Sequence, residues 1–172
     1  KRNILYLNQG GYGLGDRDYY HEKRFEDIRK SYLKYLKSLF MAVGLDSVQA
    51  LINAQNCIFV ETRLTEKALT RLELRDIEKQ YNPVTISDLK TWNSSFDWAS
   101  YYKTYALPEG DTLIVNSIDY FKSLELLWRS VSVEELKSYL KAQIVMESAP
   151  YLSERFLKIH FDFRGRVLSG AK

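Results

Sequence analysis

Apolar residues recur every three or four positions through most of the chain, which is the spacing of an amphipathic α-helix. The pattern predicts a first long helix that Asp16 or Asp18 can cap and that ends at Gly44. A second should run from Asp46 to about Leu69. The short connection predicts that they pack antiparallel, with their apolar stripes facing each other. The inward residues expected are Phe25, Ile28, Tyr32, Tyr35, Leu36, Leu39, Phe40 and Val43 in the first helix, and Val48, Leu51, Ile52, Gln55, Ile58 and Phe59 in the second.

Shorter helices are predicted further along the chain from local start signals. Thr85 and Asp88 have the spacing of a capping box, with Asp in place of Glu, and should open a helix that ends before Asn93. Another helix is expected to begin at Phe96-Asp97-Trp98 and to end before Pro108.

Two more helices and a final helical stretch follow. Ser117 is expected to cap the first of these, and Ser132 with Glu135 forms a full capping box for the second. Pro150 marks a boundary or kink, after which residues 151–161 return to helical spacing. The residues expected to face inward after Ser132 are Leu136, Tyr139, Leu140, Ile144 and Val145.

Strand signals are few. Ile4-Leu5-Tyr6-Leu7 and Leu113-Ile114-Val115 are short apolar runs bounded by turn residues, the second by Gly110-Asp111 and Asn116-Ser117. Residues 70–83 lose the helical pattern, and Asn82-Pro83 indicates a turn. The sequence therefore predicts a mainly α, bundle-like multi-helix domain with at most two short β-strands.

Composition fits one domain. The chain has 172 residues, of which 45% are hydrophobic and 27% charged, and a net charge of +3 says little about partners. Cys57 is the single cysteine, so no disulfide can form within the chain, and its apolar neighbours favour a buried thiol. The longest apolar run, Leu39–Leu45, is far shorter than the roughly 20 residues that span a bilayer. Both ends look cut, and the N-terminus does not resemble a signal peptide, so we expect a segment of a longer protein.

Candidate chemistry is sparse. His21 and Glu22 begin like the zinc motif H-E-x-x-H, but the second ligand position holds Phe25, which cannot bind zinc. His21 is then interpreted as an exposed residue of a first helical turn, and His160 as a half-buried packing residue. The glycine-rich stretch 10–15 lacks the spacing of a phosphate loop and is interpreted as a turn. We therefore predict no catalytic, cofactor-binding or metal-binding residue within 1–172.

One basic helix leaves nucleic-acid binding open as an alternative. Its cations alternate with Tyr32 and Tyr35, which could stack on bases, but Glu22, Glu26 and Asp27 would repel phosphates. A solvated face with tyrosines at the edge of the core is favoured. The cations are Lys23, Arg24, Arg29, Lys30, Lys34 and Lys37.

A series of short motifs resembles the neprilysin and endothelin-converting-enzyme family of zinc metallopeptidases. Residues 13–20, GLGDRDYY, resemble the family's G-L-P-x-R-D-Y-Y, and residues 81–85, YNPVT, resemble its Y-N-x-M-T. Two departures fall in turns: Gly15 stands where proline is usual, and Pro83 where lysine is common. Further matches, in the expected order, are Asp88-Leu89, Phe96-Asp97-Trp98, Ile114-Val115, Asp119-Tyr120-Phe121, Leu136–Leu140, Ala149–Ser153, Phe163-Arg164-Gly165 and Leu168-Ser169-Gly170.

The resemblance implies a role within a larger enzyme. In that family a helical N-terminal domain covers a thermolysin-like catalytic domain, and the substrate lies in a chamber between them. This chain, 1–172, then corresponds to a single segment of the helical, substrate-enclosing domain, with the catalytic domain and its zinc ligands outside it. In that reading Asp16 or Asp18 caps a helix, Tyr19 and Tyr20 anchor its start, and Arg17 pairs with a buried acid.

Function is predicted accordingly. The parent is expected to be a zinc metalloendopeptidase that cleaves oligopeptides, while this segment alone is inactive and contacts neither nucleic acid nor a membrane. A single cysteine favours a bacterial member, and the resemblance favours a location outside the cytoplasm. The alternatives are a free-standing helical protein-interaction module and a nucleic-acid-binding helical domain. Substrate identity and oligomeric state do not follow from the sequence.

Overall fold

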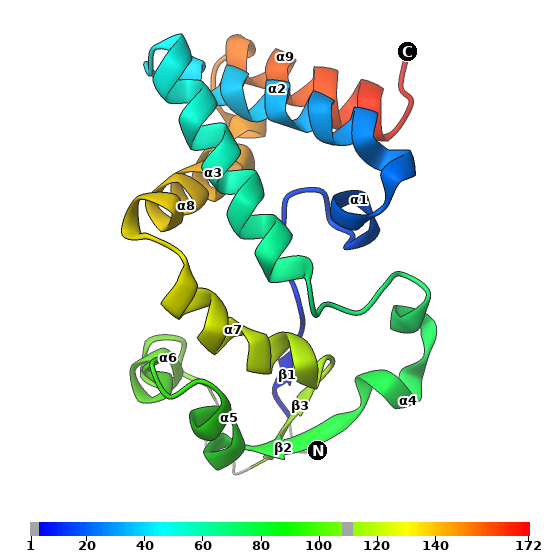
Figure 1. Ribbon diagram of the computed structural model, residues 1–172, viewed down its shortest axis with the longest axis vertical. Coiled ribbons are helices and arrows are strands. Elements are labelled where there is room, and N and C mark those ends of the chain that lie inside the picture. Colours follow the sequence, from blue (N-terminus) through cyan, green and yellow to red (C-terminus); the bar gives the residue numbers. More distant parts are fainter. Residues whose placement is uncertain (1–3, 108–111) are drawn as a thin grey trace. The chain divides into compact units, whose positions relative to one another are not determined.

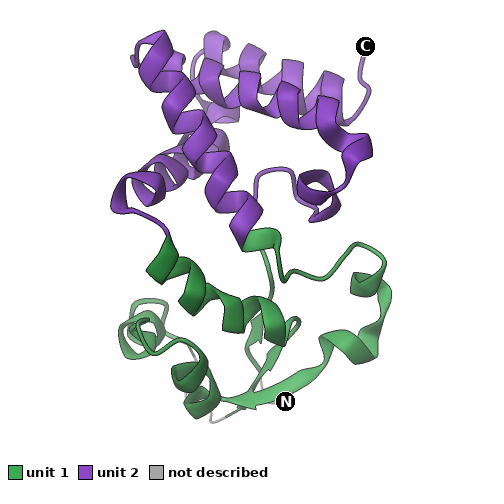
Figure 2. Ribbon diagram, viewed as in Figure 1, with its two compact units in different colours: residues 1–10, 64–130 green, residues 11–63, 131–172 purple. Residues whose placement is uncertain are grey.

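The chain folds into two compact units in the computed structural model, which describes residues 4–107 and 112–172. Unit 1 comprises Lys1–Gly10 and Leu64–Ser130, and unit 2 comprises Gly11–Arg63 and Val131–Lys172 (Figure 2). Each unit therefore joins two stretches that are far apart in sequence. The boundaries predicted at Pro108, Gly110 and Asp111 lie outside the described residues.

Unit 2 is helical, as the spacing of apolar residues predicts. Its core contains Tyr32, Leu36 and Phe40 together with the small residues Ala54 and Cys57. Burial of the Cys57 thiol confirms the interpretation of the single cysteine. The helices are α1 (Asp18–His21), α2 (Glu26–Ala42), α3 (Ser47–Thr65), α8 (Val133–Ser148) and α9 (Glu154–His160), with the 3-10 turns η1 (Lys23–Phe25) and η3 (Ala149–Tyr151) and the π-helix η4 (Phe161–Leu168).

The first predicted helix is interrupted near its start. Glu22 has an extended backbone, with φ −88° and ψ 136°, and separates α1 from η1 and α2. The Nη1 group of Arg29 donates hydrogen bonds to the carbonyl oxygens of Tyr19, at 2.7 Å, and Glu22, at 2.9 Å. Because a side chain donates to both carbonyl oxygens, neither loses its hydrogen bond where the helix is broken. The spacing of apolar residues alone could not predict the break at Glu22.

The predicted antiparallel pair of long helices is wrong. Helix α2 lies beside α9 and also packs on α8 and η4, while α3 runs at an angle to it (Figure 1). The inward face of α3 also differs: it buries Ala50, Ala54, Cys57, Val60 and Glu61. The predicted inward residues Val48, Ile52 and Phe59 are exposed, and the helix ends at Thr65 rather than near Leu69.

Helix α8 shows the same kind of error. Its capping box is confirmed, because Ser132 Oγ accepts from the N–H of Glu135 and the Glu135 carboxylate accepts from the N–H of Ser132. Its buried residues, however, are Ser138, Ala142 and Met146. Leu140 and Ile144, which were expected inward, are 57% and 67% exposed.

Unit 1 combines short helices with a small sheet. A mainly α fold is thus confirmed, but with a third strand, because β2 (Asn82–Thr85) forms where a turn was predicted. The strand order is β1-β3-β2, with β1 parallel and β2 antiparallel to β3. Pro83 has no N–H to donate, and it is tolerated because β2 is an edge strand. The elements are β1 (Tyr6–Leu7), η2 (Glu73–Arg75), α4 (Ile77–Gln80), β2 (Asn82–Thr85), α5 (Ile86–Trp92), α6 (Trp98–Thr104), β3 (Thr112–Val115) and α7 (Ile118–Ser130).

Two of the three start signals predicted for unit 1 are confirmed. Thr85 and Asp88 form a reciprocal capping box, and Asp97 caps α6 by accepting a hydrogen bond from the N–H of Ser100 at 3.0 Å. The prediction for Ser117 is wrong, because its buried hydroxyl oxygen has no hydrogen-bond partner in the described structure and so does not cap α7. Across the described ranges, no helix combines the length and apolar character needed to cross a membrane.

Candidate functional site

Within the residues that the structure describes, no group of His, Cys, Asp and Glu side chains could hold a metal ion. His21 ends α1 and is exposed, as interpreted from the sequence. Phe25, at the position where a zinc motif would need its second histidine, is half-buried and packs on Tyr19 with 4.6 Å between ring centroids. The His21-Glu22 pair therefore belongs to a helix end.

His160 is a packing residue. It is half-buried, and its Nδ1 lies 3.1 Å from the hydroxyl oxygen of Tyr35. Burial, reinforced by the positive charge of Arg164, lowers the pKa of His160, and burial raises the pKa of Tyr35 to about 12. Both groups are therefore uncharged at neutral pH, which suits a contact beside the stacked rings of Tyr35 and Phe163.

The most concentrated polar site of unit 2 surrounds Glu61, whose side chain is fully buried. Its Oε1 accepts hydrogen bonds from Gly13 N–H at 2.9 Å, Tyr32 hydroxyl at 3.0 Å and Gln143 Nε2 at 2.9 Å. Its Oε2 accepts from the hydroxyl of Tyr20 at 2.9 Å. Donors from four separate positions of the chain thus meet on one carboxyl group.

Burial dominates the electrostatics of this site. Removal from water raises the pKa of the Glu61 carboxyl, and the hydrogen bonds from Gly13, Tyr20, Tyr32 and Gln143 oppose that rise. Burial next to Glu61 also raises the pKa of the Tyr20 and Tyr32 hydroxyls. The tyrosines therefore keep their protons and remain donors, so the site holds the fold together and has no acid–base pair in reach of solvent.

The GLGDRDYY segment is organised around this carboxyl group. Gly13 has no room for a side chain, since an added Cβ would lie 2.0 Å from the Tyr32 hydroxyl oxygen. Tyr20 is buried, and its hydroxyl accepts a hydrogen bond from the N–H of Leu14 at 3.0 Å. The glycine-rich turn therefore presents a backbone N–H to a carboxylate of its own chain.

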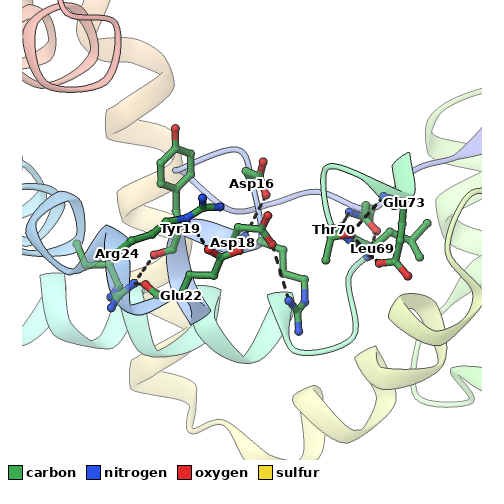
Figure 3. Close-up of polar contacts among 11 residues, drawn as sticks. Asp16, Asp18, Tyr19, Glu22, Arg24, Leu69, Thr70 and Glu73 are labelled. Carbon is green, nitrogen blue, oxygen red and sulfur yellow. Dashed lines mark hydrogen bonds and ion pairs between the residues drawn. The ribbon is translucent and has the colours of Figure 1, made fainter. Parts of the chain in front are cut away.

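The polar residues of the same segment fix the start of α1 (Figure 3). Asp16 Oδ1 accepts a hydrogen bond from the N–H of Asp18, the first residue of the short helix α1, at 3.0 Å. The long helix α2, which Asp16 or Asp18 was predicted to cap, instead begins after Phe25 without a side-chain cap. Arg17 pairs with its neighbour Asp18 at 3.9 Å, and both side chains are partly buried. The predicted pairing of Arg17 with a buried acid is therefore wrong, because Asp18 is only partly buried and the four donors to buried Glu61 given above are uncharged.

The basic helix does not have the geometry of a nucleic-acid surface. Tyr32 and Tyr35 are 0% and 4% exposed, so neither ring can stack on a base. Three of the six cations are also engaged within unit 2: Lys30 pairs with Glu26 at 2.8 Å, Arg24 pairs with Glu22 at 2.6 Å, and Arg29 donates to the two carbonyl oxygens given above. The alternative of a nucleic-acid-binding domain is therefore not favoured.

Comparison with known proteins decides the family. A model of the N-terminal part of peptidase family M13 matches residues 1–172. The chain belongs to peptidase family M13. The resemblance to the neprilysin and endothelin-converting-enzyme group is thus confirmed.

Relatives of this M13 chain include animal and bacterial proteins. Endothelin-converting enzyme 1 of Cavia porcellus is 27% identical over 161 residues, which are 90% of this chain and 21% of that protein. Membrane metallo-endopeptidase-like 1 of Mus musculus is 22% identical over 178 residues. The zinc metalloprotease Zmp1 of Mycobacterium tuberculosis, in complex with an inhibitor, matches with a TM-score of 0.90 and 29% identity over 99% of this chain and 26% of that one. This M13 chain therefore spans about a fifth to a quarter of the length of these relatives.

Glu61 was missed from the sequence because a glutamate in a helix is usually exposed. A signal nevertheless existed: Ala50, Ala54, Cys57 and Glu61 follow each other at spacings of four, three and four, which is one helical face. The small residues on that face mark a close contact. A carboxyl group in line with them is therefore a candidate for burial with partners.

Proposed function

We propose that this chain is a non-catalytic part of the substrate-enclosing region of a zinc metalloendopeptidase that cleaves oligopeptides. Family membership over the whole chain is the observation that carries the proposal. The chain contributes helices and a small sheet, and the zinc and its ligands belong to a part of the parent outside residues 1–172. Both units together form this segment.

The relatives support an enclosure that opens. Zmp1 has been solved in an open state, in a partial open state and with an inhibitor, and each structure matches at least 97% of this chain. A protease that opens and closes can admit a peptide, exclude bulk water around the zinc, and reject molecules too large to enter. We assign this chain to the walls of such an enclosure.

One surface of unit 2 fits the role of a wall. We define the α3 stripe as Val48, Ile52 and Phe59, which are 66%, 43% and 41% exposed on one side of the helix. Beside it lies a groove of about 380 Å³ lined by Leu33, Ile58 and Phe59 among other residues of α2 and α3. Apolar surface of this kind suits contact with the varied side chains of a peptide.

The parent protein provides the test. Its reading frame is expected to contain H-E-x-x-H followed by E-x-x-x-D downstream of Lys172, and metal analysis should find one zinc in the parent and none in the chain of residues 1–172. The parent should cleave short unstructured peptides at least a hundredfold faster than stable folded proteins that contain the same cleavage sequence. Equal rates on both would overturn the enclosing role. A stoichiometric zinc in residues 1–172 would overturn the proposal that the zinc site lies outside this chain.

Location is part of the same proposal. One relative is named a membrane metallo-endopeptidase-like protein, which supports a parent that works outside the cytoplasm. A signal peptide or anchor encoded upstream of Lys1 is the expected finding. A cytoplasmic parent, shown by fractionation, would contradict it and would leave the enclosing role untouched.

A further inference from the structure

Unit 1 contains an aromatic cavity of about 220 Å³. Phe96 lies within 4.7 Å of Trp98 and 5.7 Å of Tyr101, measured between ring centroids. The cavity is lined by Leu7, Asn8, Asn93, Phe96, Trp98, Tyr101, Phe121, Leu124 and Trp128.

Two residues of this lining each have a buried polar atom without a hydrogen-bond partner in the described structure. One is an acceptor, Asn93 Oδ1, and the other is a donor, Trp98 Nε1. The two residues are only 1% and 6% exposed. A buried polar atom without a partner costs about 1–3 kcal/mol, so such atoms are uncommon in folded proteins and call for an explanation. An acceptor and a donor on two lining residues of one cavity together suit a ligand that supplies both complementary groups.

The two side chains are held in place by their surroundings. The Nδ2 group of Asn93 donates to the carbonyl oxygen of Phe121 at 2.8 Å. This bond fixes the orientation of the amide, whose Oδ1 is the atom without a partner. Trp98 begins α6, whose first turn is capped by Asp97. The loop between Asn93 and Trp98 is hydrogen-bonded to α7. Ser95 donates to the Glu125 carboxylate through its hydroxyl at 2.7 Å and through its N–H at 3.2 Å. The Asn93 amide and the start of α6 are therefore held in place before a ligand binds.

The size of the cavity limits its contents. An apolar cavity of about 150 Å³ is known to admit benzene. A cavity of about 220 Å³ therefore has space for a phenyl or branched aliphatic side chain and part of an adjoining amide.

A peptide has the required chemistry in one place, since each residue joins a side chain to an N–H donor and a C=O acceptor. We propose that this cavity binds an apolar residue of a peptide, with its side chain among the rings, its N–H on Asn93 Oδ1 and its C=O on Trp98 Nε1. The choice of a peptide rests on the proposed function, and binding itself does not require hydrolysis. Because both polar atoms are sealed from solvent, the partly exposed rings of Phe96 and Trp128, each 38% exposed, have to move aside on binding.

The indole N–H resonance of Trp98 in two-dimensional ¹H–¹⁵N NMR reports directly on this hydrogen bond. Titration of residues 1–172 with N-acetyl-L-phenylalaninamide should move this resonance to saturation and downfield, as a new acceptor reaches the indole N–H. Trp92 is the internal reference, because its ring lies under the Lys122 ammonium group and does not line the cavity. Substitution of each tryptophan by Phe assigns the three resonances.

Two further probes separate the contribution of the aromatic ring to binding from that of the amide. Toluene supplies the ring without the amide and should bind about tenfold more weakly or worse, since two hydrogen bonds are lost. N-acetylglycinamide supplies the amide without the ring and should not saturate the shift. Leu124→Phe fills the cavity and should abolish binding, whereas the matched variant Leu126→Phe, at a 68% exposed position of the same helix, should bind normally.

Three outcomes would overturn the proposal. The first is a Trp98 resonance that does not saturate, and the second is equal affinity for toluene and N-acetyl-L-phenylalaninamide. The third is binding by residues 1–172 that is absent in the parent protein, which would mean that another part of the parent occupies the cavity. The proposed enclosing function is tested by the cleavage rates and zinc content of the parent. That function and the binding of a peptide in this cavity can therefore fail independently.

Discussion

At the residue scale, Glu61 shows how a charged side chain can organise a helical core. The carboxyl group satisfies a backbone N–H, two tyrosine hydroxyls and an amide that would otherwise be buried without acceptors. Burial of the carboxyl group by itself is unfavourable. Glu61 therefore stabilises the fold through the hydrogen bonds that it accepts.

Replacement of Glu61 by Leu should lower the free energy of unfolding by about 4 kcal/mol, because several buried donors lose their acceptor. Urea denaturation followed by far-UV circular dichroism measures the change. The matched control is Glu147→Leu on the exposed surface of α8, which should change stability by less than about 0.5 kcal/mol. Equal effects of the two substitutions would contradict a central role for Glu61.

Gly15 offers a second test at this scale. Its φ is +76°, and its N–H donates to the carbonyl oxygen of Tyr12 at 3.1 Å. Proline, which is usual here in the related family, fixes φ near −65° and has no N–H. We therefore expect Gly15→Pro to destabilise this chain by about 3 kcal/mol or more, although it restores the common residue.

Thermal unfolding of Gly15→Pro measures this effect, with Gly10→Ala as the control. Gly10 has no positive φ, and an added Cβ there would meet nothing within 4 Å, so its replacement should be nearly neutral. A stabilised Gly15→Pro variant would mean that the turn can adopt the proline conformation without loss.

At the scale of elements, the two capping boxes and the buried face of α2 were predicted correctly, whereas the Ser117 cap and the inward faces of α3 and α8 were not. The capping boxes at Thr85 and Ser132 involve only neighbouring residues, so the sequence contains everything needed to predict them. The inward faces of α3 and α8 depend on what packs against them. There Ala54, Cys57 and Ala142 are buried by close approach, while larger apolar residues remain exposed. The Glu61 site depends on the same tertiary contacts and was missed for the same reason.

The junction between α7 and the loop before α6 has a pH dependence that can be measured. Hydrogen bonds from Ser95, above all from its hydroxyl, and the pair with Arg129 lower the pKa of Glu125 from 4.5 to about 2. A lowered folded-state pKa contributes stability that is fully present above the unfolded value and is lost as pH falls towards the folded value. The junction should therefore loosen between pH 4.5 and about 2.

Hydrogen exchange at the Ser95 N–H, which donates to Glu125 at 3.2 Å, follows this junction. Its protection relative to an unstructured peptide should fall across that pH range. The Tyr101 N–H, which donates to the carbonyl oxygen of Asp97 at 3.1 Å, serves as the reference within α6. In Glu125→Gln the protection of Ser95 should be low and independent of pH. Constant protection in the unmodified chain would contradict this account.

At the scale of the whole molecule, the role of the exposed apolar surfaces depends on the longer parent protein proposed above. The chain covers about a quarter of Zmp1 and about a fifth of endothelin-converting enzyme 1, so most of a comparable parent lies outside it. The α3 stripe is then either a wall of the substrate enclosure, a contact with another segment, or an outer surface. These three cases differ in which molecules can reach it.

Thiol labelling at Val48→Cys distinguishes them, because the native Cys57 is buried and burial raises its pKa well above the usual value, so it reacts slowly. In residues 1–172 alone, small and bulky maleimides should both label Cys at this 66% exposed position at the rate of a free thiol. In the parent, a wall of the enclosure should still admit the small reagent but slow a maleimide attached to a 5-kDa polymer by about tenfold or more, as a size-selective opening requires. Equal slowing of both reagents would indicate burial against another segment, and no slowing would place the stripe on the outside. Either result would remove the α3 stripe from the proposed wall.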